Sequence, residues 1–250
     1  MGGEMTHIDM LPENDTHASR LSVGVLTADL TRLAADLDML HGTDCWAHID
    51  VMDGCFCPNL TFGAPIIKAV AACGVPADAH LMVEEPRQIL AEVVAAGPHV
   101  VTVHAEAGKH LHRTMQELTA LCADLPSDQR PIRGIALNPG SPIELIEPVF
   151  DMVDLVLVLA VNPGWSSQRP AANTERRVQA VRRLAASFNK EVLVGIDGGV
   201  TMANVAQVAG WHPDVIVSGS AIYDGRTPAA NLAKMRSLIV EGSVNQGEAV

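Results

Sequence analysis

Aromatic side chains are scarce in this chain of 250 residues, at 3% of the total, although 48% of the residues are hydrophobic. The core must therefore be filled by Ala, Val, Leu and Ile, which is typical of α/β proteins that bury a parallel sheet. A chain of this length can form one large core, and a single α/β barrel commonly has this size. Composition alone favours a single-domain barrel or a doubly wound sheet.

Basic residues are few as well, since 17 Lys and Arg stand against 29 Asp and Glu and give a formal net charge of −12. Nucleic acids and anionic membrane surfaces bind basic faces, so we expect neither as a partner. A small anionic substrate is compatible with this charge, because backbone N–H groups and helix N-termini bind anions locally.

Long apolar runs are also absent: no stretch of about 18 residues is free of charges, so no transmembrane helix is expected. Residues 1–20 are acidic and have neither the basic start nor the apolar centre of a signal peptide, and we interpret them as a polar N-terminal extension. The cysteines number five, without a regular spacing, which favours reduced thiols and a cytoplasmic location.

Short runs rich in Val, Ile and Leu alternate with amphipathic segments along the whole chain. The runs predict eight strands, near residues 21–26, 45–50, 77–81, 100–104, 132–137, 155–159, 192–196 and 215–218. The amphipathic segments predict helices near residues 30–40, 65–72, 86–96, 110–122, 141–149, 173–186, 201–209 and 228–240. Strands that are each followed by a helix indicate a (β/α)8 TIM barrel, a single domain over residues 21–240, with residues 241–250 as a C-terminal tail.

Acidic and imidazole side chains lie at the ends of three of these strands. His48 and Asp50 share one face of the second strand, His80 ends the third strand, and Asp197 ends the seventh. Each could be structural by itself, because Asp caps turns and a buried His can bind a carbonyl group. Strand ends that present His and Asp toward one axis are harder to explain by packing, and the C-terminal rim of a barrel is where active sites are built.

Two imidazoles and two carboxylates are suitable ligands for one divalent ion, which can be zinc, iron, manganese or cobalt. Such an ion polarises a carbonyl group, and a carboxylate beside it can move a proton. The residues therefore predict carbon-acid chemistry at a metal site formed by His48, Asp50, His80 and Asp197.

Other polar residues near these strand ends have simpler interpretations. Asp53 and Gly54 are expected to shape the turn after the second strand. We expect His104 to be a hydrogen-bonded neighbour of the site or a buried side chain, since four ligands are already supplied. Cys55 and Cys57 are expected to be small loop residues, because zinc sites favour a C-x2-C spacing.

Glycines follow the last two strands. Gly198 and Gly199 come after the seventh strand, and Gly219 with Ser220 after the eighth. Each pair could serve a tight turn, but loops after strands seven and eight form the usual phosphate site of this barrel. We therefore expect a phosphate group to bind there.

Several short motifs accompany these strand ends in chain order: HIDVMDG (48–54), PNLTFG (58–63), HLMV (80–83), VTVHAE (101–106), LNP (137–139), VNPG (161–164), DGG (197–199) and SGSAI (218–222). Together they span the predicted barrel and resemble the ribulose-phosphate 3-epimerase family. The resemblance implies an isomerase with one divalent ion, often zinc, that interconverts D-ribulose 5-phosphate and D-xylulose 5-phosphate in the pentose phosphate route.

The resemblance also implies roles for individual residues. Asp50 and Asp197 are the acid and base on opposite faces of an enediolate, and Met52 and Met82 pack beside it. His80 would also contact the substrate. A phosphate lid is implied at Gly164, Trp165, Ser166 and Ser167, together with the glycine loops of the last two strands.

The sequence departs from the family at positions expected near the substrate, whereas the four positions expected to bind the metal are unchanged. Gly24 stands where the family has Ser, Ser166 and Ser167 replace lid glycines, Leu159 replaces a Met, and Gly195 replaces a Glu. Epimerisation of another ketose phosphate, such as allulose 6-phosphate or a shorter phosphoketose, is therefore an alternative, and a noncatalytic metal-binding paralogue is another.

A metal-dependent hydrolase on the same barrel would need a His-x-His pair on the first strand, where Gly24 and Leu26 stand instead. Barrels of this family commonly associate, so we expect a homo-oligomer. Trp46 and Trp211 could belong to the interface or to the core.

Overall fold

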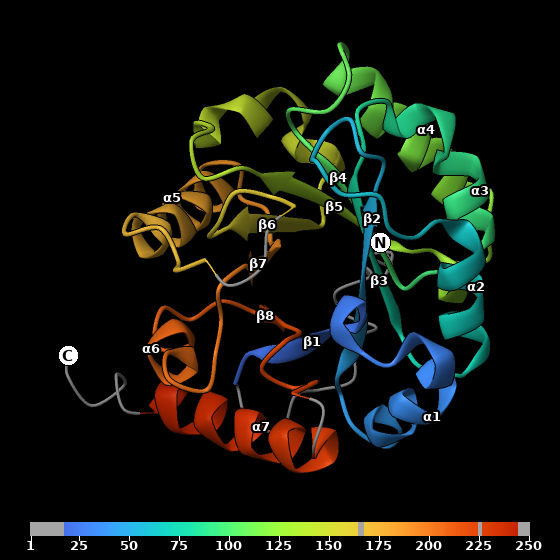
Figure 1. The fold of residues 1–250 in the computed structure, drawn as a ribbon. Coiled ribbons are helices and arrows are strands. Elements are labelled where there is room, and N and C mark those ends of the chain that lie inside the picture. The colour runs from blue at the N-terminus through green and yellow to red at the C-terminus, as the bar shows by residue number, and fades with distance from the viewer. Residues whose placement is uncertain (1–17, 165–167, 225–226, 245–250) are drawn as a thin grey trace.

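The chain folds into the (β/α)8 barrel that the sequence predicts (Figure 1). The structure is a computed structural model that describes residues 18–164, 168–224 and 227–244. Its strands pair in sequence order, all parallel, and β8 pairs with β1 to close the barrel. The strands are β1 (Arg20–Gly24), β2 (Trp46–Met52), β3 (Ala77–Met82), β4 (Val100–His104), β5 (Ile132–Leu137), β6 (Leu155–Leu159), β7 (Leu193–Asp197) and β8 (Val215–Ser218).

The helices lie outside the barrel and cover the outer face of the strands (Figure 1). They are α1 (Leu33–Leu37), α2 (Ala64–Ala72), α3 (Leu90–Ala95), α4 (Leu111–Ala123), α5 (Thr174–Ser187), α6 (Val205–Ala209) and α7 (Pro228–Val244). Short 3-10 helices occur at Val25–Thr27, Leu30–Arg32, Asp38–Leu40, Pro86–Gln88, Ser127–Gln129 and Ile143–Met152. The described elements run from Arg20 to Val244, and the sequence predicts a domain over residues 21–240.

Several predicted helices are not regular α-helices throughout; in the segment predicted at 86–96, a 3-10 helix at Pro86–Gln88 precedes the α-helix Leu90–Ala95. The segment predicted at 30–40 is divided, because only Leu33–Leu37 is α-helical and 3-10 turns flank it on both sides. The segment predicted at 141–149 is a 3-10 helix over Ile143–Met152 with Pro148 inside it. Proline has no N–H group and its ring clashes with the carbonyl four residues earlier, which disfavours an α-helix there.

The helix predicted at 201–209 is also shorter than expected, and α6 begins only at Val205. The Asn204 side chain explains the difference, since its Oδ1 accepts a hydrogen bond from the Thr201 N–H at 2.7 Å. Its Nδ2 donates to the Gly199 carbonyl at 2.9 Å. These bonds hold the chain in a turn that is fixed to the loop after β7, and local side-chain bonds of this kind compete with helix formation.

Part of the barrel interior is apolar. It is a cluster of buried side chains from the strands: Trp46, Val100, Ile132, Ala136, Leu155, Leu157, Leu159, Val215 and Val217. The guanidinium carbon of Arg20 lies 5.1 Å from the Trp46 ring centre, a cation–π contact inside the barrel. Trp46 therefore belongs to the core and not to an interface, and Trp211 packs partly buried against the core as well.

Among the described residues, no helix is both long enough and apolar enough to cross a membrane. All five cysteines are free thiols, as expected from their spacing. Cys55 is exposed in the loop after β2, whereas Cys57 is buried.

Candidate active site

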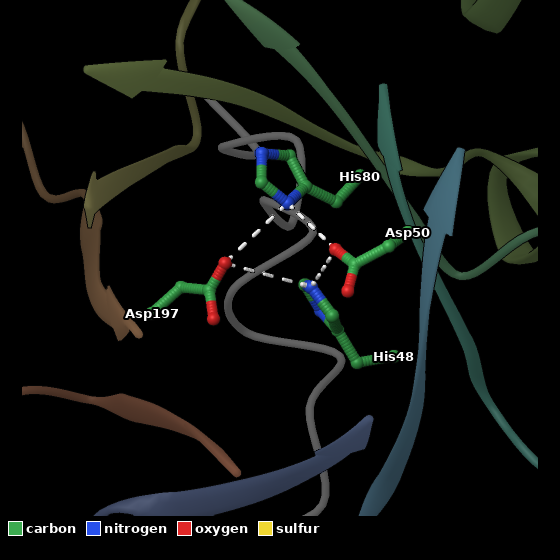
Figure 2. A group of neighbouring side chains, drawn as sticks. All are labelled: His48, Asp50, His80 and Asp197. Carbon is green, nitrogen blue, oxygen red and sulfur yellow. Dashed lines mark hydrogen bonds and ion pairs between the residues drawn. The ribbon is translucent and has the colours of Figure 1, made fainter. Parts of the chain in front are cut away.

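Four side chains from three strands meet inside the C-terminal end of the barrel: His48, Asp50, His80 and Asp197 (Figure 2). Strand pairing places Asp50 beside His80, and alternation along β2 brings His48 to the same face as Asp50. Asp50 Oδ1 is 3.1 Å from His48 Nε2 and 3.2 Å from His80 Nδ1. Asp197 Oδ2 is 3.5 Å from His80 Nδ1 and 3.9 Å from His48 Nε2. The structure thus brings together all four side chains that the sequence singles out.

The four ligand atoms fit a divalent ion. They all lie within 4.8 Å of one another. Nitrogen and oxygen ligands about 2.0–2.1 Å from a tetrahedral zinc ion are about 3.3–3.4 Å from each other, and the four nitrogen-to-oxygen separations, which range from 3.1 to 3.9 Å, bracket that value. Both imidazoles are fully buried, whereas the Asp50 and Asp197 side chains are 20% and 17% exposed, so the centre is open toward the rim.

The two carboxylates have different electrostatic environments. Burial raises the pKa of Asp197, and the nearby Asp50 raises it further. Burial also disfavours the charged form of Asp50, but His48 and His80 outweigh it and hold the pKa of Asp50 below its ordinary value. Two carboxyl groups whose proton affinities are pushed apart are suited to act as an acid and a base.

Asp78 supports His48 from behind, a role that we did not predict from the sequence. The buried Asp78 Oδ2 lies 2.7 Å from His48 Nδ1 and also accepts a hydrogen bond from Ser22 Oγ at 2.7 Å. A His48 ring that donates from Nδ1 to a carboxylate keeps the lone pair of Nε2 directed at the centre, as in many metal sites. A signal was present in the sequence, because Asp78 precedes His80 by two residues and therefore shares its face.

We expect Asp78→Asn to weaken zinc binding by about 10- to 100-fold, because it removes the negative charge that orients His48 and makes the ring a stronger ligand. Competition with a chromophoric chelator measures this affinity. Asp128→Asn, at an exposed position in a 3-10 turn, is the matched control and should bind zinc as the unaltered protein does. Equal affinity in the two variants would contradict the supporting role of Asp78.

His104 lies next to the cluster and not in it, as the sequence predicts. Its side chain is fully buried, and its Nε2 is 2.9 Å from His80 Nε2. Burial lowers the pKa of His104 to about 4, so the imidazole is neutral. Glu106, whose role was not predicted from the sequence, contacts the other ring nitrogen, with Oε2 3.2 Å from His104 Nδ1.

The loop after β2 has the turn that was expected. Asp53 Oδ1 accepts hydrogen bonds from the N–H groups of Cys55 and Phe56 at 2.8 and 2.9 Å, and Gly54 has a positive φ of 74°. Neither Cys55 nor Cys57 belongs to the four-residue cluster, in agreement with the interpretation of both as loop residues.

Met52 and Met82 follow Asp50 and His80 by two residues on β2 and β3, so they lie on the same face one step closer to the rim. Both are buried and form a small apolar cluster with Cys57. Leu26 and Phe56 pack against this cluster. A water-poor apolar surface therefore adjoins the carboxylates.

The glycine loops predicted to bind phosphate surround the same rim. Gly198 and Gly199 follow β7 with φ values of 110° and 69°, and Gly164 follows β6 with a φ of 91°. A Cβ atom on Gly199 would lie 2.6 Å from the Gln168 carbonyl oxygen, and one on Gly164 would lie 2.9 Å from Pro58 Cδ, so both loops need glycine at these positions. Gly219 and the exposed Ser220 follow β8. The predicted lid residues Trp165, Ser166 and Ser167 lie outside the described residues.

The departures at Gly24 and Gly195 leave no side chain at either point. A Cβ atom on Gly24 would be 3.2 Å from Gly219 Cα, so β1 and the loop after β8 approach each other closely. A Cβ atom on Gly195 would be 2.8 Å from Leu157 Cδ1, so an apolar side chain already fills the space beside that position. A larger side chain at either position would thus require its neighbours to shift.

The chain is similar to several known enzymes. It is 38% identical over 208 residues to the ribulose-phosphate 3-epimerase of Bacillus subtilis, which covers 82% of this chain and 92% of the relative. It is 35% identical over 210 residues to the chloroplastic ribulose-5-phosphate-3-epimerase of Arabidopsis thaliana, which covers 82% of this chain and 72% of that protein.

Solved structures of other barrel enzymes share the fold. KGPDC from Streptococcus mutans superposes with a TM-score of 0.64 at 12% identity, covering 89% of this chain and 97% of that one. The 3-hexulose-6-phosphate synthase of Salmonella typhimurium gives a TM-score of 0.60 at 16% identity, with 90% and 99% covered. At these identities the likeness concerns the fold alone.

A sequence model of the Ribulose-phosphate 3 epimerase family matches residues 20–223, nearly all of the barrel. Together with the relatives at 35–38% identity, this match confirms the resemblance and the isomerase class that the motifs imply. The chain belongs to the Ribulose-phosphate 3 epimerase family.

Proposed function

We propose that this protein interconverts D-ribulose 5-phosphate and D-xylulose 5-phosphate by inverting C3. The observation that carries the proposal is the convergence of two carboxylates and two imidazoles at the rim of a barrel of this family. The substrate is inferred from the names of the relatives. The acid–base chemistry is inferred from the four side chains.

Asp50 and Asp197 act as the acid and the base. They enter the centre from β2 and β7, on opposite sides in the view of Figure 2. A planar enediolate between them would have one carboxylate on each face, so that one removes the C3 proton and the other delivers a proton from the far side. Their unequal pKa values suit this division, and the roles exchange with the direction of the reaction.

His48, Asp50, His80 and Asp197 would hold one divalent ion, for which zinc is our first choice and iron, manganese and cobalt are alternatives. When bound, the ion would supply electrophilic stabilisation of the charge that develops on the substrate oxygens. Met52 and Met82 exclude water beside the intermediate, which strengthens the electrostatic interactions there.

Deuterium exchange at C3 tests the proposal. The purified protein is mixed with zinc or manganese and ribulose 5-phosphate in deuterated water, and NMR follows both the C3 proton and the appearance of xylulose 5-phosphate. We expect rapid exchange together with epimerisation. Because Gly24 carries no side chain at the substrate end of β1, allulose 6-phosphate and a shorter phosphoketose complete the panel. Exchange with one of these alone would reassign the substrate, and no exchange at all would favour a noncatalytic paralogue.

The phosphate group is proposed to bind to the loops at Gly164, Gly198, Gly199 and Gly219, with Ser220 beside them. Ser220→Asp should raise KM by about tenfold or more, because a carboxylate would repel the phosphate at short range while leaving the acid and base in place. Steady-state kinetics measure the change. Gln207→Asp adds the same charge at an exposed position on α6, and its KM should not change. Equal KM values in both variants would move the phosphate site elsewhere.

We further propose that the protein serves the pentose phosphate route in the cytoplasm and forms a homo-oligomer, as its family suggests.

A further inference from the structure

A chain of hydrogen bonds leads away from the centre through His80. His80 Nδ1 faces Asp50 and Asp197, and its Nε2 lies 2.9 Å from His104 Nε2. The two rings are 24° from parallel with centres 5.0 Å apart, so they meet nearly edge to edge. A nitrogen-to-nitrogen bond of this kind requires that one ring donates and the other accepts.

Glu106 determines which ring donates. Its Oε1 accepts hydrogen bonds from the Asn138 N–H at 2.8 Å and from the Ser141 hydroxyl. The loop that holds Glu106 is itself fixed, because the Arg177 guanidinium on α5 donates to the carbonyl oxygens of Asn138 and Ser141 at 2.9 and 2.5 Å. The remaining oxygen, Oε2, is 3.2 Å from His104 Nδ1. An ionised carboxylate only accepts, so His104 must donate from Nδ1.

The direction of every other bond follows. A neutral imidazole carries one N–H, so a His104 ring that donates from Nδ1 accepts at Nε2. His80 must then donate from Nε2. A neutral His80 that carries its proton on Nε2 has a lone pair on Nδ1, and this lone pair points at the carboxylates of the centre.

We propose that Glu106 and His104 are positioning residues that fix the His80 tautomer, so that His80 Nδ1 presents a lone pair to the divalent ion. This inference rests on the proposed function in one respect, the binding of an ion by His80. It explains a difference between the two imidazoles of the centre. His48 receives its orienting carboxylate, Asp78, directly, whereas the carboxylate that orients His80 acts through a second ring.

These hydrogen bonds from Glu106 through His104 to His80, which we call the relay, oppose a competing arrangement in which His80 carries its proton on Nδ1. Asp50 and Asp197 are both acceptors near His80 Nδ1, and by themselves they favour a proton on that nitrogen. A proton there would block a ligand bond, because a metal ligand must offer a lone pair. Glu106, which acts on His80 through the His104 ring, therefore controls whether His80 Nδ1 can bind the ion.

Glu106→Gln would reverse the direction of the hydrogen bonds in the relay without changing the size of the side chain. The amide oxygen must take the place of Oε1, since the backbone N–H of Asn138 can only donate. The amide N–H would then point at His104 Nδ1, which must accept, and His104 would donate from Nε2 to His80. The His80 proton would move to Nδ1, toward the centre.

The experiment combines two measurements. Long-range 1H–15N NMR correlations of the metal-free protein with 15N-labelled histidine show which ring nitrogens carry protons, with His104→Gln used to assign the His104 signals. Chelator competition gives the zinc affinity. We expect His104 protonated at Nδ1 in the unaltered protein and at Nε2 in Glu106→Gln, with zinc bound about 10- to 100-fold more weakly by the variant. Glu92→Gln, an exposed change on α3, should alter neither measurement.

A second pair of variants tests the relay even if the Glu106→Gln variant does not fold. The His104→Gln amide can accept from His80 and donate to Glu106, so it should keep zinc affinity within a few-fold, whereas His104→Leu should lose about 10- to 100-fold. The same His104 tautomer in the unaltered protein and in Glu106→Gln, or equal zinc affinity in the two His104 variants, would overturn the proposal. Tautomers as expected without any zinc binding would support the relay and refute the proposed metal site.

Discussion

Asp197→Asn is expected to stop epimerisation while leaving proton exchange with one of the two epimers. The amide cannot take up a proton from C3, and loss of a general acid or base costs about 10²- to 10⁴-fold in rate. The amide oxygen can still occupy the ligand position of Asp197 in the cluster, so the site is expected to remain assembled. Asp50 then remains able to remove the C3 proton on its own face and to return deuterium to that same face.

Asp50→Asn should give the complementary result. Each variant retains one carboxylate, so each is expected to exchange deuterium into one epimer only, and the two variants should act on opposite epimers. NMR in deuterated water with pure ribulose 5-phosphate or xylulose 5-phosphate distinguishes the four combinations. The unaltered protein, by comparison, should exchange and invert both.

The pattern of exchange separates two mechanisms. Exchange of both epimers by either single variant would mean that one carboxylate serves both faces, contrary to the proposal of an acid and a base on opposite sides. Asp151→Asn, at an exposed position in a 3-10 helix, controls for the change in charge and should retain full activity.

Much of the fold is readable in the sequence because each of its β/α units repeats the same local physics. Buried parallel strands are continuous apolar runs, and each of these runs is a strand in the structure. Helix limits were less predictable, since they depend on single side chains. Pro148 disfavours an α-helix, and Asn204 holds a turn that delays the start of α6, although the apolar spacing around both is helical.

The same contrast applies to the site. His48, Asp50, His80 and Asp197 could be found because strand alternation and the barrel rim predict where their side chains meet. The supporting carboxylates could not. Their importance depends on which residue faces which across the sheet, and the register that pairs His48 with Asp78 is a property of the folded barrel.

Glu106 was harder still to identify. Its contacts with Asn138 and Ser141 join the end of β4 to the loop after β5, and Arg177 holds that loop from α5. None of these residues is close to Glu106 in the sequence. A motif that contains His104 and Glu106 suggests a polar pair, but only the three-dimensional arrangement shows which residue donates and which accepts in their hydrogen bond.

Removal of the divalent ion is expected to have the second large effect. Dialysis against a strong chelator should lower both epimerisation and C3 exchange by at least about 10³-fold, because electrophilic stabilisation by a metal contributes several kcal/mol to the transition state. The metal-free protein should also unfold at a lower temperature, since a ligand at 1,000 times its Kd stabilises the folded state by about 4 kcal/mol. Addition of zinc, iron, manganese or cobalt, one at a time, should restore activity to different degrees and so identify the preferred metal.

Two matched variants connect this result to the four residues. His80→Gln removes a ligand of the proposed centre, so zinc should no longer raise its unfolding temperature, whereas His112→Gln, on the exposed face of α4, should respond to zinc as the unaltered protein does. If zinc stabilised both variants equally, the ion would bind elsewhere. If chelated protein shown to be free of metal kept its full rate, the carboxylates alone would suffice, and the imidazoles of His48 and His80 would need another explanation, as hydrogen-bond donors to the substrate oxygens.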